Sequence, residues 1–335
     1  MIREKHKPAA KPKNKKCDKC KAPAVITLGY GPHYFCENHF TTFFEKRFRK
    51  TIRRNRLLKK GEKIIVALSG GKDSTLLLFL LKKFYANTNK IEALMVDEGI
   101  KGYRDESIKT AKKNCERLGV KLTIVPFKKV FGITDDEIMP IVAKNSKLGG
   151  TCSFCGTLRR NVLNKYAKKM GADKVATAHN LDDEVQSTVM NIFSNDMKRF
   201  KRMGAVAGLV DHKGFVKRIK PFYETPENEI VAYCAFKEIN YFGGECCPHS
   251  WTAKRNEYRE MLNKFEENFP GTKYALLRFY EEVKPLFALK QKEKKFALNT
   301  LKECANCGEP TEKELCMACT QVKKIKELKK SVPKK

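Results

Sequence analysis

The sequence predicts an α/β protein built on a parallel sheet, with a small metal-binding domain near each end. Two observations predict this class. Apolar strand-like runs alternate with amphipathic helix-like runs through the middle of the chain, as in a parallel sheet that helices cover on both faces. Cysteines gather near the two ends in pairs whose spacing suits a metal ion. The 335 residues are enough to bury a sizeable core and to form more than one domain.

Four apolar runs are expected to form the strands of the sheet, at residues 63–68, 91–97, 121–127 and 174–178. The helices between them are expected at residues 75–84, 105–118 and 157–170. In a parallel sheet, ligands bind at the carboxyl ends of the strands. We therefore expect the loop at 69–74 and the turns after Asp97 and Ala178 to share one rim. Residues 224 to about 294 have apolar side chains at helical spacing and are expected to form packing helices.

The loop Ser69-Gly70-Gly71-Lys72-Asp73-Ser74 follows the first strand and precedes a helix. Its two glycines let the backbone approach an anion closely, and the helix N-terminus offers free N–H groups to phosphate oxygens. Lys72 adds a positive charge, and the two serines add hydroxyl donors. A Walker A loop would need Ser or Thr after the lysine, where this chain has Asp73. The loop resembles the PP-loop of the ATP pyrophosphatases, which implies cleavage of ATP between its α and β phosphates.

The charge of the chain favours a polyanionic partner. Lys and Arg number 69 against 38 acidic residues, a formal net charge of +31. The excess is uneven, because residues 1–60 carry 18 basic and 4 acidic side chains, and nine of the fifteen residues at 46–60 are basic. A solvated helix face normally mixes both signs, so this segment is expected to meet phosphates. Residues 198–202, Lys-Arg-Phe-Lys-Arg, could pair with RNA phosphates and stack on a base, or could be an exposed loop.

No apolar run is long enough to cross a bilayer, and the N-terminus lacks the apolar core of a signal peptide. We therefore expect a cytoplasmic protein with no membrane partner. In that reducing compartment, thirteen cysteines indicate metal binding rather than disulfides.

Two sets of four ligands have the spacing of closed tetrahedral zinc sites, which hold a structural ion and leave no open catalytic position. The N-terminal set is Cys17, Cys20, Cys36 and His39, and the C-terminal set is Cys304, Cys307, Cys316 and Cys319. The sequence around the C-terminal set is too short to bury a core without metal, which supports the assignment.

A third cysteine group differs from both. Cys152 and Cys155 form one Cys-x-x-Cys pair, and the nearest further cysteines are Cys246 and Cys247, about ninety residues on. A pair with one additional cysteine suits an iron–sulfur cluster with three protein ligands better than a four-thiolate zinc site. Such a cluster leaves one iron open for sulfur. A disulfide between Cys152 and Cys155, with redox chemistry carrying the sulfur, is the alternative.

Taken together, the motifs of the chain resemble those of the tRNA 2-thiouridine synthetases of the TtuA/NcsA family, within the TtcA-like PP-loop ATP pyrophosphatases. The resemblance extends from about Cys17 to Cys319. The motifs occur in the family's order: the Cys/His knuckle, the loop Ser69 to Ser74, Gly150-Thr151-Cys152-Ser153-Phe154-Cys155-Gly156, His179-Asn180-Leu181-Asp182-Asp183-Glu184, a late Cys-Pro and the C-terminal zinc ribbon.

The resemblance implies roles for individual residues. The third cluster cysteine of the family precedes a proline, which selects Cys247, with Cys246 as the fallback. Asp182 would lie near the nucleotide, and Asp183 would be a catalytic carboxylate. Lys72 and the cluster cysteines would be the other catalytic residues. Paired carboxylates on this rim could also hold Mg²⁺ against the ATP phosphates, although helix capping explains either residue alone. The residues expected to hold ATP are Ala67, Leu68, Ser69, Gly70, Gly71, Lys72, Asp73, Ser74, Met95, Val96, Ala178 and Asp182.

The implied reaction is ATP-dependent tRNA thiolation with a 4Fe-4S cluster as the sulfur-binding site. The uracil O2 of a tRNA uridine is adenylated, and sulfur then displaces AMP to give 2-thiouridine, at the wobble position by preference or in the T-loop. The sulfur donor would be free sulfide or a thiocarboxylated ubiquitin-like carrier, and the family implies a homodimer. The alternatives are a tRNA 2-thiocytidine synthetase, a non-catalytic zinc-ribbon RNA-binding protein and a redox sensor.

These inferences divide the chain into seven segments. A basic tail (1–16) precedes an N-terminal zinc finger (17–45) and a basic linker helix (46–60). The PP-loop catalytic domain (61–250) and a helical segment (251–298) follow. A C-terminal zinc ribbon (299–322) and a second basic tail (323–335) complete the chain, and both tails are expected to be disordered alone.

Overall fold

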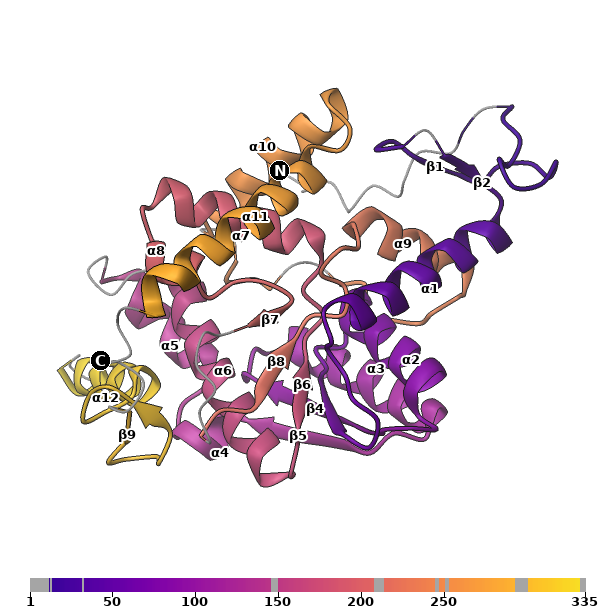
Figure 1. Cartoon of the computed structure of the whole chain (residues 1–335). Coiled ribbons are helices and arrows are strands. Elements are labelled where there is room, and N and C mark those ends of the chain that lie inside the picture. Colours follow the sequence, from indigo (N-terminus) through magenta and orange to yellow (C-terminus); the bar gives the residue numbers. More distant parts are fainter. Residues whose placement is uncertain are drawn as a thin grey trace.

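A six-stranded sheet with the strand order β5-β4-β3-β6-β8-β7 lies at the centre of the molecule (Figure 1). The structure is a computed structural model that describes residues 12, 14–31, 33–145, 150–207, 214–244, 247–250, 253–292 and 301–331. The parallel strands are β3 (Lys63–Ala67), β4 (Lys90–Asp97), β5 (Leu122–Pro126), β6 (Lys174–Ala176) and β8 (Lys217–Ile219), and β7 (Val206–Ala207) is antiparallel to β8. The predicted α/β class and the four predicted strands are confirmed.

The sheet differs from the prediction at its edges. The third predicted strand ends at Pro126, because Phe127 already begins the short helix α4 (Phe127–Phe131). The fourth ends at Ala176, two residues earlier than expected. Strands β7 and β8 were not predicted, since they have only two and three residues and β8 begins with two cations. The antiparallel β7 makes the sheet mixed rather than wholly parallel.

Helices cover both faces of the sheet. The helices that connect its strands are α2 (Lys72–Tyr85), α3 (Tyr103–Leu118), α5 (Asp135–Ala143), α6 (Thr151–Lys169) and α7 (Leu181–Phe193). The predicted helix at 157–170 begins six residues earlier, at Thr151. The first turns of α6 therefore carry Cys152 and Cys155, and both cysteines lie near the carboxyl rim of the sheet.

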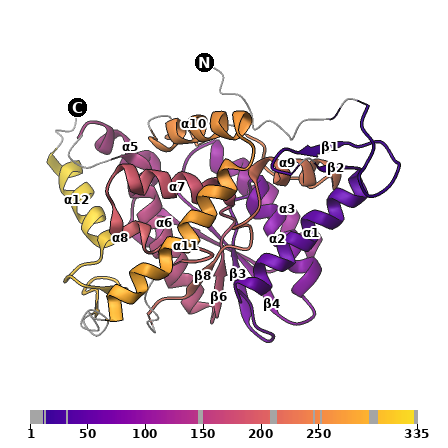
Figure 2. The same cartoon turned by 45° about the horizontal axis from the view of Figure 1, so that its top comes forward.

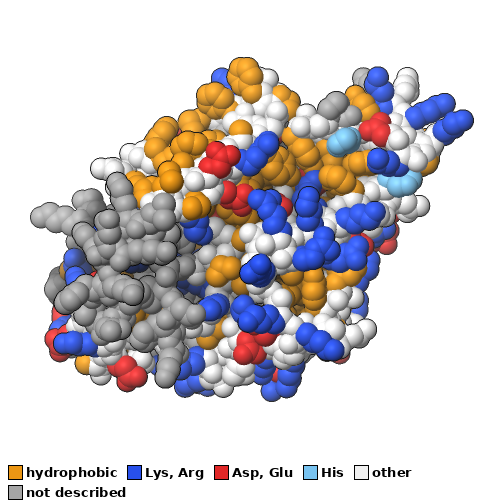
Figure 3. Space-filling model, in the orientation of Figure 1, with side chains coloured by type: hydrophobic (Ala, Val, Ile, Leu, Met, Phe, Trp, Pro, Cys, Tyr) orange, Lys and Arg blue, Asp and Glu red, His pale blue; other side chains and the backbone are white. Residues whose placement is uncertain are grey.

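Helix α1 (Glu37–Arg54) joins the N-terminal finger to the sheet layer without a break. Phe40, Phe44, Phe48 and Ile52 recur every four residues and are all buried, so one face of α1 packs into the main core. The predicted linker helix at 46–60 is not a separate element, because its first nine residues are the second half of α1. Figure 3 shows Lys and Arg side chains gathered along the outer side of this helix.

Arg47 departs from the basic face of α1. Its Nη1 lies 2.8 Å from Glu229 Oε2, and Glu229 is completely buried in α9 (Glu227–Phe236). Tyr30 of the finger donates to the other oxygen of Glu229 at 2.7 Å. Arg47 is therefore expected to fix the finger and α1 on α9 rather than to meet a phosphate.

Replacing Arg47 with methionine should destabilise the protein by about 3–5 kcal/mol, because it leaves the Glu229 carboxylate buried without its cation. The matched control is Arg54→Met. Arg54 pairs with Glu224 at 3.3 Å and with Glu281 at 3.0 Å, but 56% of its side chain is exposed, so its loss should cost about 0–1 kcal/mol. Denaturant unfolding of the two variants measures the difference, and equal costs would contradict this role for Arg47.

The two ends of the chain form small hairpins. The N-terminal finger contains β1 (Ile26–Leu28) and β2 (His33–Phe35), and the C-terminal ribbon contains β9 (Lys302–Glu303) and β10 (Pro310–Thr311). The ribbon continues into α12 (Met317–Ser331), which packs on α5 and α6. The predicted disordered tail at 323–335 is therefore wrong as far as Ser331, because Ile325 is buried and anchors the helix. Most of the predicted tail at 1–16 lies outside the described residues.

The helical prediction for 224–294 holds for α9, α10 (Arg255–Asn268) and α11 (Thr272–Lys292). The described residues between α9 and α10 are not helical. Both α10 and α11 pack against α7, and Figures 1 and 2 show these three helices side by side. The segment at 198–202 lies in and just after the short helix α8 (Met197–Phe200). Phe200 is buried against Tyr280, so the predicted stacking of this ring on a base is wrong.

None of the described helices is both long and apolar enough to cross a membrane.

Candidate active site and metal centres

The loop between β3 and α2 has the backbone that a phosphate cradle needs. Gly70 has φ +86°, and a Cβ there would lie 2.6 Å from the carbonyl oxygen of Ser107, so glycine is required for both conformation and space. The Ser69 N–H donates to Ser74 Oγ at 3.0 Å, and the two serine hydroxyls lie 2.9 Å apart. Because α2 begins at Lys72, the free N–H groups of its first turn lie at the loop.

Lys72 lies between two carboxylates. Its Nζ is 3.0 Å from Asp73 Oδ2 and 2.6 Å from Glu227 Oε1. Burial alone would lower the pKa of Lys72, but the two carboxylates outweigh it and raise the pKa above the ordinary value. Lys72 is therefore a cation at neutral pH, as contact with a phosphate requires.

Asp182 joins three elements beneath this lysine. Its Oδ2 accepts from the backbone N–H of Glu227 at 2.8 Å, and its Oδ1 accepts from Lys273 of α11. Asn180, the N-cap of α7, donates to Asp73 Oδ1 at 3.1 Å. The structure thus brings Asp182 to the phosphate loop, through Glu227. Sequence reasoning missed Glu227 and Lys273, because neither lies in a recognisable motif.

Asp183 lies at the start of α7 and is held by an arginine. Its side chain accepts from the Asn180 N–H at 3.2 Å, and Arg255 Nη1 lies 3.2 Å from its Oδ1. Arg255 also donates to Ser187 Oγ at 2.9 Å, so the first turn of α10 clamps the first turns of α7. Asp183 is also close enough to affect Asp73 electrostatically. Burial is the main cause that raises the pKa of Asp73, and the negative charges of Glu227 and Asp183 raise it further, whereas Lys72 lowers it. Both candidate carboxylates therefore lie near the phosphate loop.

The three candidate cluster cysteines adjoin the same rim. Cys152 is exposed, and its Sγ lies 4.0 Å from the carbonyl oxygen of His249, two residues after the partly buried Cys247. Cys155 is buried, and Arg159 Nη2 lies 3.6 Å from its Sγ. Cys246, the alternative ligand, lies outside the described residues. All twelve described cysteines are free thiols, so the disulfide considered between Cys152 and Cys155 is not formed here.

Burial, only partly offset by Arg159, raises the pKa of the Cys155 thiol to about 12. Among the described residues, the groups whose ligand atoms all lie within 4.8 Å of one another are the two terminal sets, and the central cysteines are not one of them. The central cysteines are therefore too far apart for one tetrahedral ion. Three cysteines are a donor set that an iron–sulfur cluster could use.

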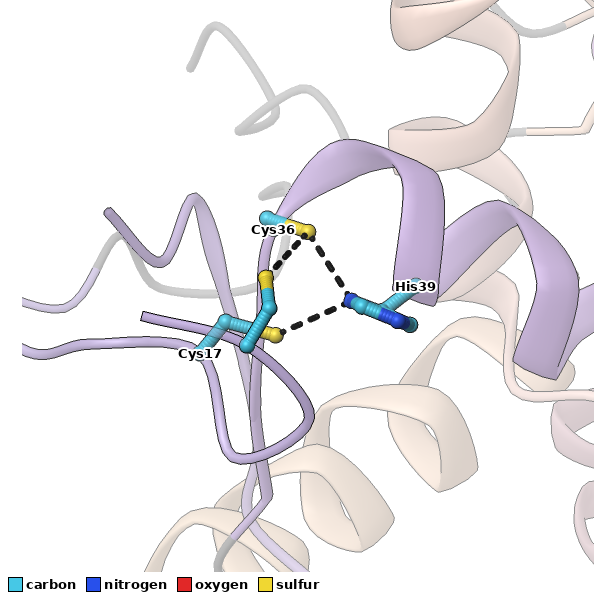
Figure 4. A group of neighbouring side chains, drawn as sticks. Cys17, Cys36 and His39 are labelled. Carbon is cyan, nitrogen blue, oxygen red and sulfur yellow. Dashed lines mark hydrogen bonds between the residues drawn. The ribbon is translucent and has the colours of Figure 1, made fainter. Parts of the chain in front are cut away.

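The N-terminal ligand set converges closely. Figure 4 shows Cys17 and Cys36 directed toward His39, whose Nδ1 lies 3.4 Å and 3.3 Å from the two sulfurs. Cys20 Sγ lies 3.7 Å from Cys36 Sγ. Against the effect of burial, backbone N–H donors lower the pKa of Cys17 to about 6, which favours the thiolate that a metal needs.

The C-terminal set has the same form with four cysteines. Cys307 and Cys316 sulfurs are 3.6 Å apart, and backbone N–H groups donate to Cys304 at 3.2 Å and to Cys316 at 3.5 Å. Asn161 of α6 contacts the sulfurs of Cys307 and Cys316 at 4.0 and 3.9 Å. The ribbon therefore packs on the helix that carries the central cysteines.

Three comparisons with known proteins agree with this site. The PP-loop domain family matches residues 40–265. The chain is 35% identical to the tRNA 2-thiolation protein NcsA of Haloferax volcanii, over 92% of this chain and 98% of that one. It is 38% identical to the tRNA-5-methyluridine(54) 2-sulfurtransferase of Pyrococcus horikoshii, over 91% and 92%. It is 34% identical to the cytoplasmic tRNA 2-thiolation protein 1 of Chlamydomonas reinhardtii, over 90% and 83%.

A solved structure has the same fold over most of its length. It is the U34-tRNA thiolase NcsA from Methanococcus maripaludis with its [4Fe-4S] cluster, with a TM-score of 0.75 and 34% sequence identity. The match covers 91% of this chain and 95% of that one. The phosphate loop, the rim carboxylates and the cysteine sets thus occur together in a fold shared with a thiolase.

Proposed function

Because this chain belongs to the PP-loop family of tRNA 2-thiolation proteins, we propose that it is an ATP-dependent tRNA uridine 2-sulfurtransferase. The observation that carries the proposal is the single rim that holds both the phosphate loop at Lys72 and the three cysteines. A phosphate cradle alone would serve many reactions. A cradle beside three cysteines suited to an iron–sulfur cluster joins ATP activation to sulfur delivery.

The reaction has two displacements. The O2 atom of a tRNA uracil attacks the α-phosphorus of ATP, and pyrophosphate leaves. A hydrosulfide equivalent then attacks C2, the C2–O bond breaks and AMP leaves, so that one ATP yields AMP, pyrophosphate and 2-thiouridine. The loop N–H groups and Lys72 bind the phosphates and stabilise the charge that develops on them. Mg²⁺ would be held by the rim carboxylates, including Asp73, which lies 3.0 Å from the Lys72 ammonium group.

We place the Asp183 carboxylate next to the uracil of the target nucleotide, where it orients the uracil or takes the proton released on adenylation. Asp182 supports the nucleotide site by holding the N-terminus of α9 and Lys273 in place. The backbone of Met95 and Val96, at the end of the buried strand β4, is proposed to hold the adenine. Cys152, Cys155 and Cys247 would hold the 4Fe-4S cluster, which would supply a binding position for the sulfur.

The target position is proposed as the wobble uridine, with the T-loop uridine as the alternative. The names of the relatives differ on this point, since one is a U34-tRNA thiolase and another is a tRNA-5-methyluridine(54) 2-sulfurtransferase. The test incubates anaerobically purified protein with an unmodified tRNA transcript, ATP, Mg²⁺ and sulfide, and measures 2-thiouridine by mass spectrometry of the digested RNA. Transcripts with cytidine at position 34 or 54 identify the site. A lack of thiolated nucleoside in every tRNA, with the iron fully loaded, would refute the function.

Each terminal ligand set is proposed to hold one structural zinc. Cys316→Ala should lower the zinc content from two ions to one per chain and release the ribbon from α6, while ATP binding is retained. Elemental analysis and limited proteolysis between 300 and 331 would report both changes. Cys234→Ala is the control, because that buried cysteine lies outside all three sets. A zinc content of two in Cys316→Ala would contradict the assignment.

A cytoplasmic homodimer remains the proposed state of the protein, with free sulfide or a thiocarboxylated ubiquitin-like carrier as the sulfur donor. The exposed aromatic side chains of α10, of the turn after it and of α11 support an interface there, since Phe265, Phe269 and Phe279 are 49%, 64% and 53% exposed. Light scattering of the wild type and of Phe269→Glu would test it. A monomeric wild type would contradict the dimer.

A further inference from the structure

Two arginines lie close enough to interact electrostatically beside the cysteine site, Arg160 on α6 and Arg218 on β8 (Figure 1). Asn164 of α6 joins these elements, because its Oδ1 accepts from the Val216 N–H at 2.9 Å and its Nδ2 donates to the Gly214 carbonyl at 3.0 Å. Arg160 lies one helical turn before Asn164, and Arg218 lies two residues after Val216, each on the same side as its neighbour. Helix α6 begins at the carboxyl rim of the sheet and β8 ends there. Arg160 is therefore closer to that rim than Asn164, and Arg218 is closer to it than Val216.

Within the described ranges, no carboxylate lies within ion-pair distance of Arg160 or Arg218. Arg160 donates to the Thr157 hydroxyl at 3.4 Å, and this neutral partner does not compensate its charge. Desolvation, and then the positive charges of Arg218, Arg159 and Arg199, lower the pKa of Arg160 to about 10. Crowded cations without an acid are costly in a folded chain, and an anionic ligand would relieve the repulsion.

We propose that Arg160 and Arg218 form a binding site for a backbone phosphate of the RNA strand next to the target nucleotide. The proposal rests on the proposed function, because it assumes that a tRNA nucleotide enters this rim. The planar guanidinium groups can each donate two parallel hydrogen bonds to a phosphate. Arg160 lies only five residues after Cys155, so a phosphate held here would place the neighbouring base near the cysteine site.

The ATP phosphates are a less suitable ligand for this pair. The phosphate loop follows β3, and β8 is separated from β3 by β6, so Arg218 lies about 10 Å to one side at the usual strand spacing. The ATP phosphates also have a cation of their own in Lys72. A longer polyanion is favoured because further exposed cations follow outward from the pair on and after α8, at Lys198, Arg199 and Arg202. A peptide carboxylate would need only one of these charges.

The test measures the affinity of fluorescently labelled tRNA by anisotropy at several salt concentrations, for Arg160→Ala, Arg218→Ala and the double variant. Each single variant should weaken binding about tenfold and reduce the slope of log Kd against log salt by about 0.7–1, the effect of one lost phosphate contact. The KM for ATP, the iron content and the thermal midpoint should stay at wild-type values. Lys113→Ala, an exposed cation on α3 away from the rim, is the control for charge alone and should change neither quantity.

Three outcomes would overturn the proposal. Unchanged tRNA affinity and salt slope would show that no phosphate binds here. A raised KM for ATP with normal tRNA binding would place the pair in the nucleotide site. Normal tRNA binding and normal activity with sulfide, but lost activity with a protein sulfur donor, would assign the pair to the carrier. If the wild type binds tRNA but thiolates none, the proposed function fails, whereas the arginine site is still decided by the binding data.

Discussion

Cys155→Ala is expected to abolish thiolation and to lose the iron while both zinc ions stay bound. Replacing a residue that merely orients a metal ligand typically costs about 10–100-fold in activity, so removing one of only three ligands should cost at least about 100-fold. The same result is expected for Cys152→Ala and Cys247→Ala. The measurements are the iron and zinc content of anaerobically purified protein and the yield of 2-thiouridine.

The matched control for this series is Cys115→Ala. Cys115 is a buried thiol of α3 whose pKa burial raises to about 11, and it belongs to none of the three ligand sets. It should keep its iron, its zinc and its activity. Wild-type iron content in Cys155→Ala, or equal iron loss in Cys115→Ala, would contradict the assignment. A Cys247→Ala variant that keeps its iron would transfer the third ligand to Cys246.

Asp183→Asn should lower kcat by about 10²–10⁴-fold, the usual contribution of a positioned acid or base, with little change in ATP affinity. The amide can still accept from the Asn180 N–H and so keeps the cap of α7, but it loses the negative charge and the ion pair with Arg255. Single-turnover formation of AMP and 2-thiouridine would measure the effect on the chemical step.

Asp196→Asn is the comparison for Asp183. Asp196 also accepts a backbone N–H at a helix start, pairs with an arginine at 3.3 Å and has the same 31% exposed side chain, yet it lies outside the proposed catalytic group. It should retain kcat within a small factor. Similar losses in both variants would reduce Asp183 to a helix cap, and a loss confined to ATP binding would move its role to the nucleotide.

The sequence predicted those parts of the fold that depend on local patterns. Strands β3 and β4 were predictable because apolar residues follow one another, with three consecutive buried ones in β3 and four in β4. Strands β7 and β8 were not, since their two or three residues owe their conformation to pairing with the existing sheet. Arg218 was missed for the same reason. The continuity of α1 was also missed, because a run of cations at 46–60 obscured the buried phenylalanines at four-residue spacing.

The site divides in the same way. The loop at Lys72, Asp183 and the metal-binding cysteines lie in short motifs whose chemistry is legible from residue type and spacing. The groups that hold them come from elsewhere, since Glu227 reaches Lys72 across 155 positions and Lys273 reaches Asp182 across 91. Arg255 likewise comes from a helix that begins 72 positions after Asp183. Such contacts exist only after folding, so a single sequence carries no local signal for them.

The unbroken helix α1 has a consequence for how an RNA could bind. One end of α1 carries His39 of the finger, and the other end is buried beside the sheet, so its eighteen residues act as a spacer of about 27 Å. The distance between the finger and the sheet is therefore constant. An RNA that touches both must bend its own backbone to match this distance. Removing four residues from the middle of α1 would shorten the spacer by about 6 Å, rotate the finger by a little over one turn and delete one of the buried phenylalanines.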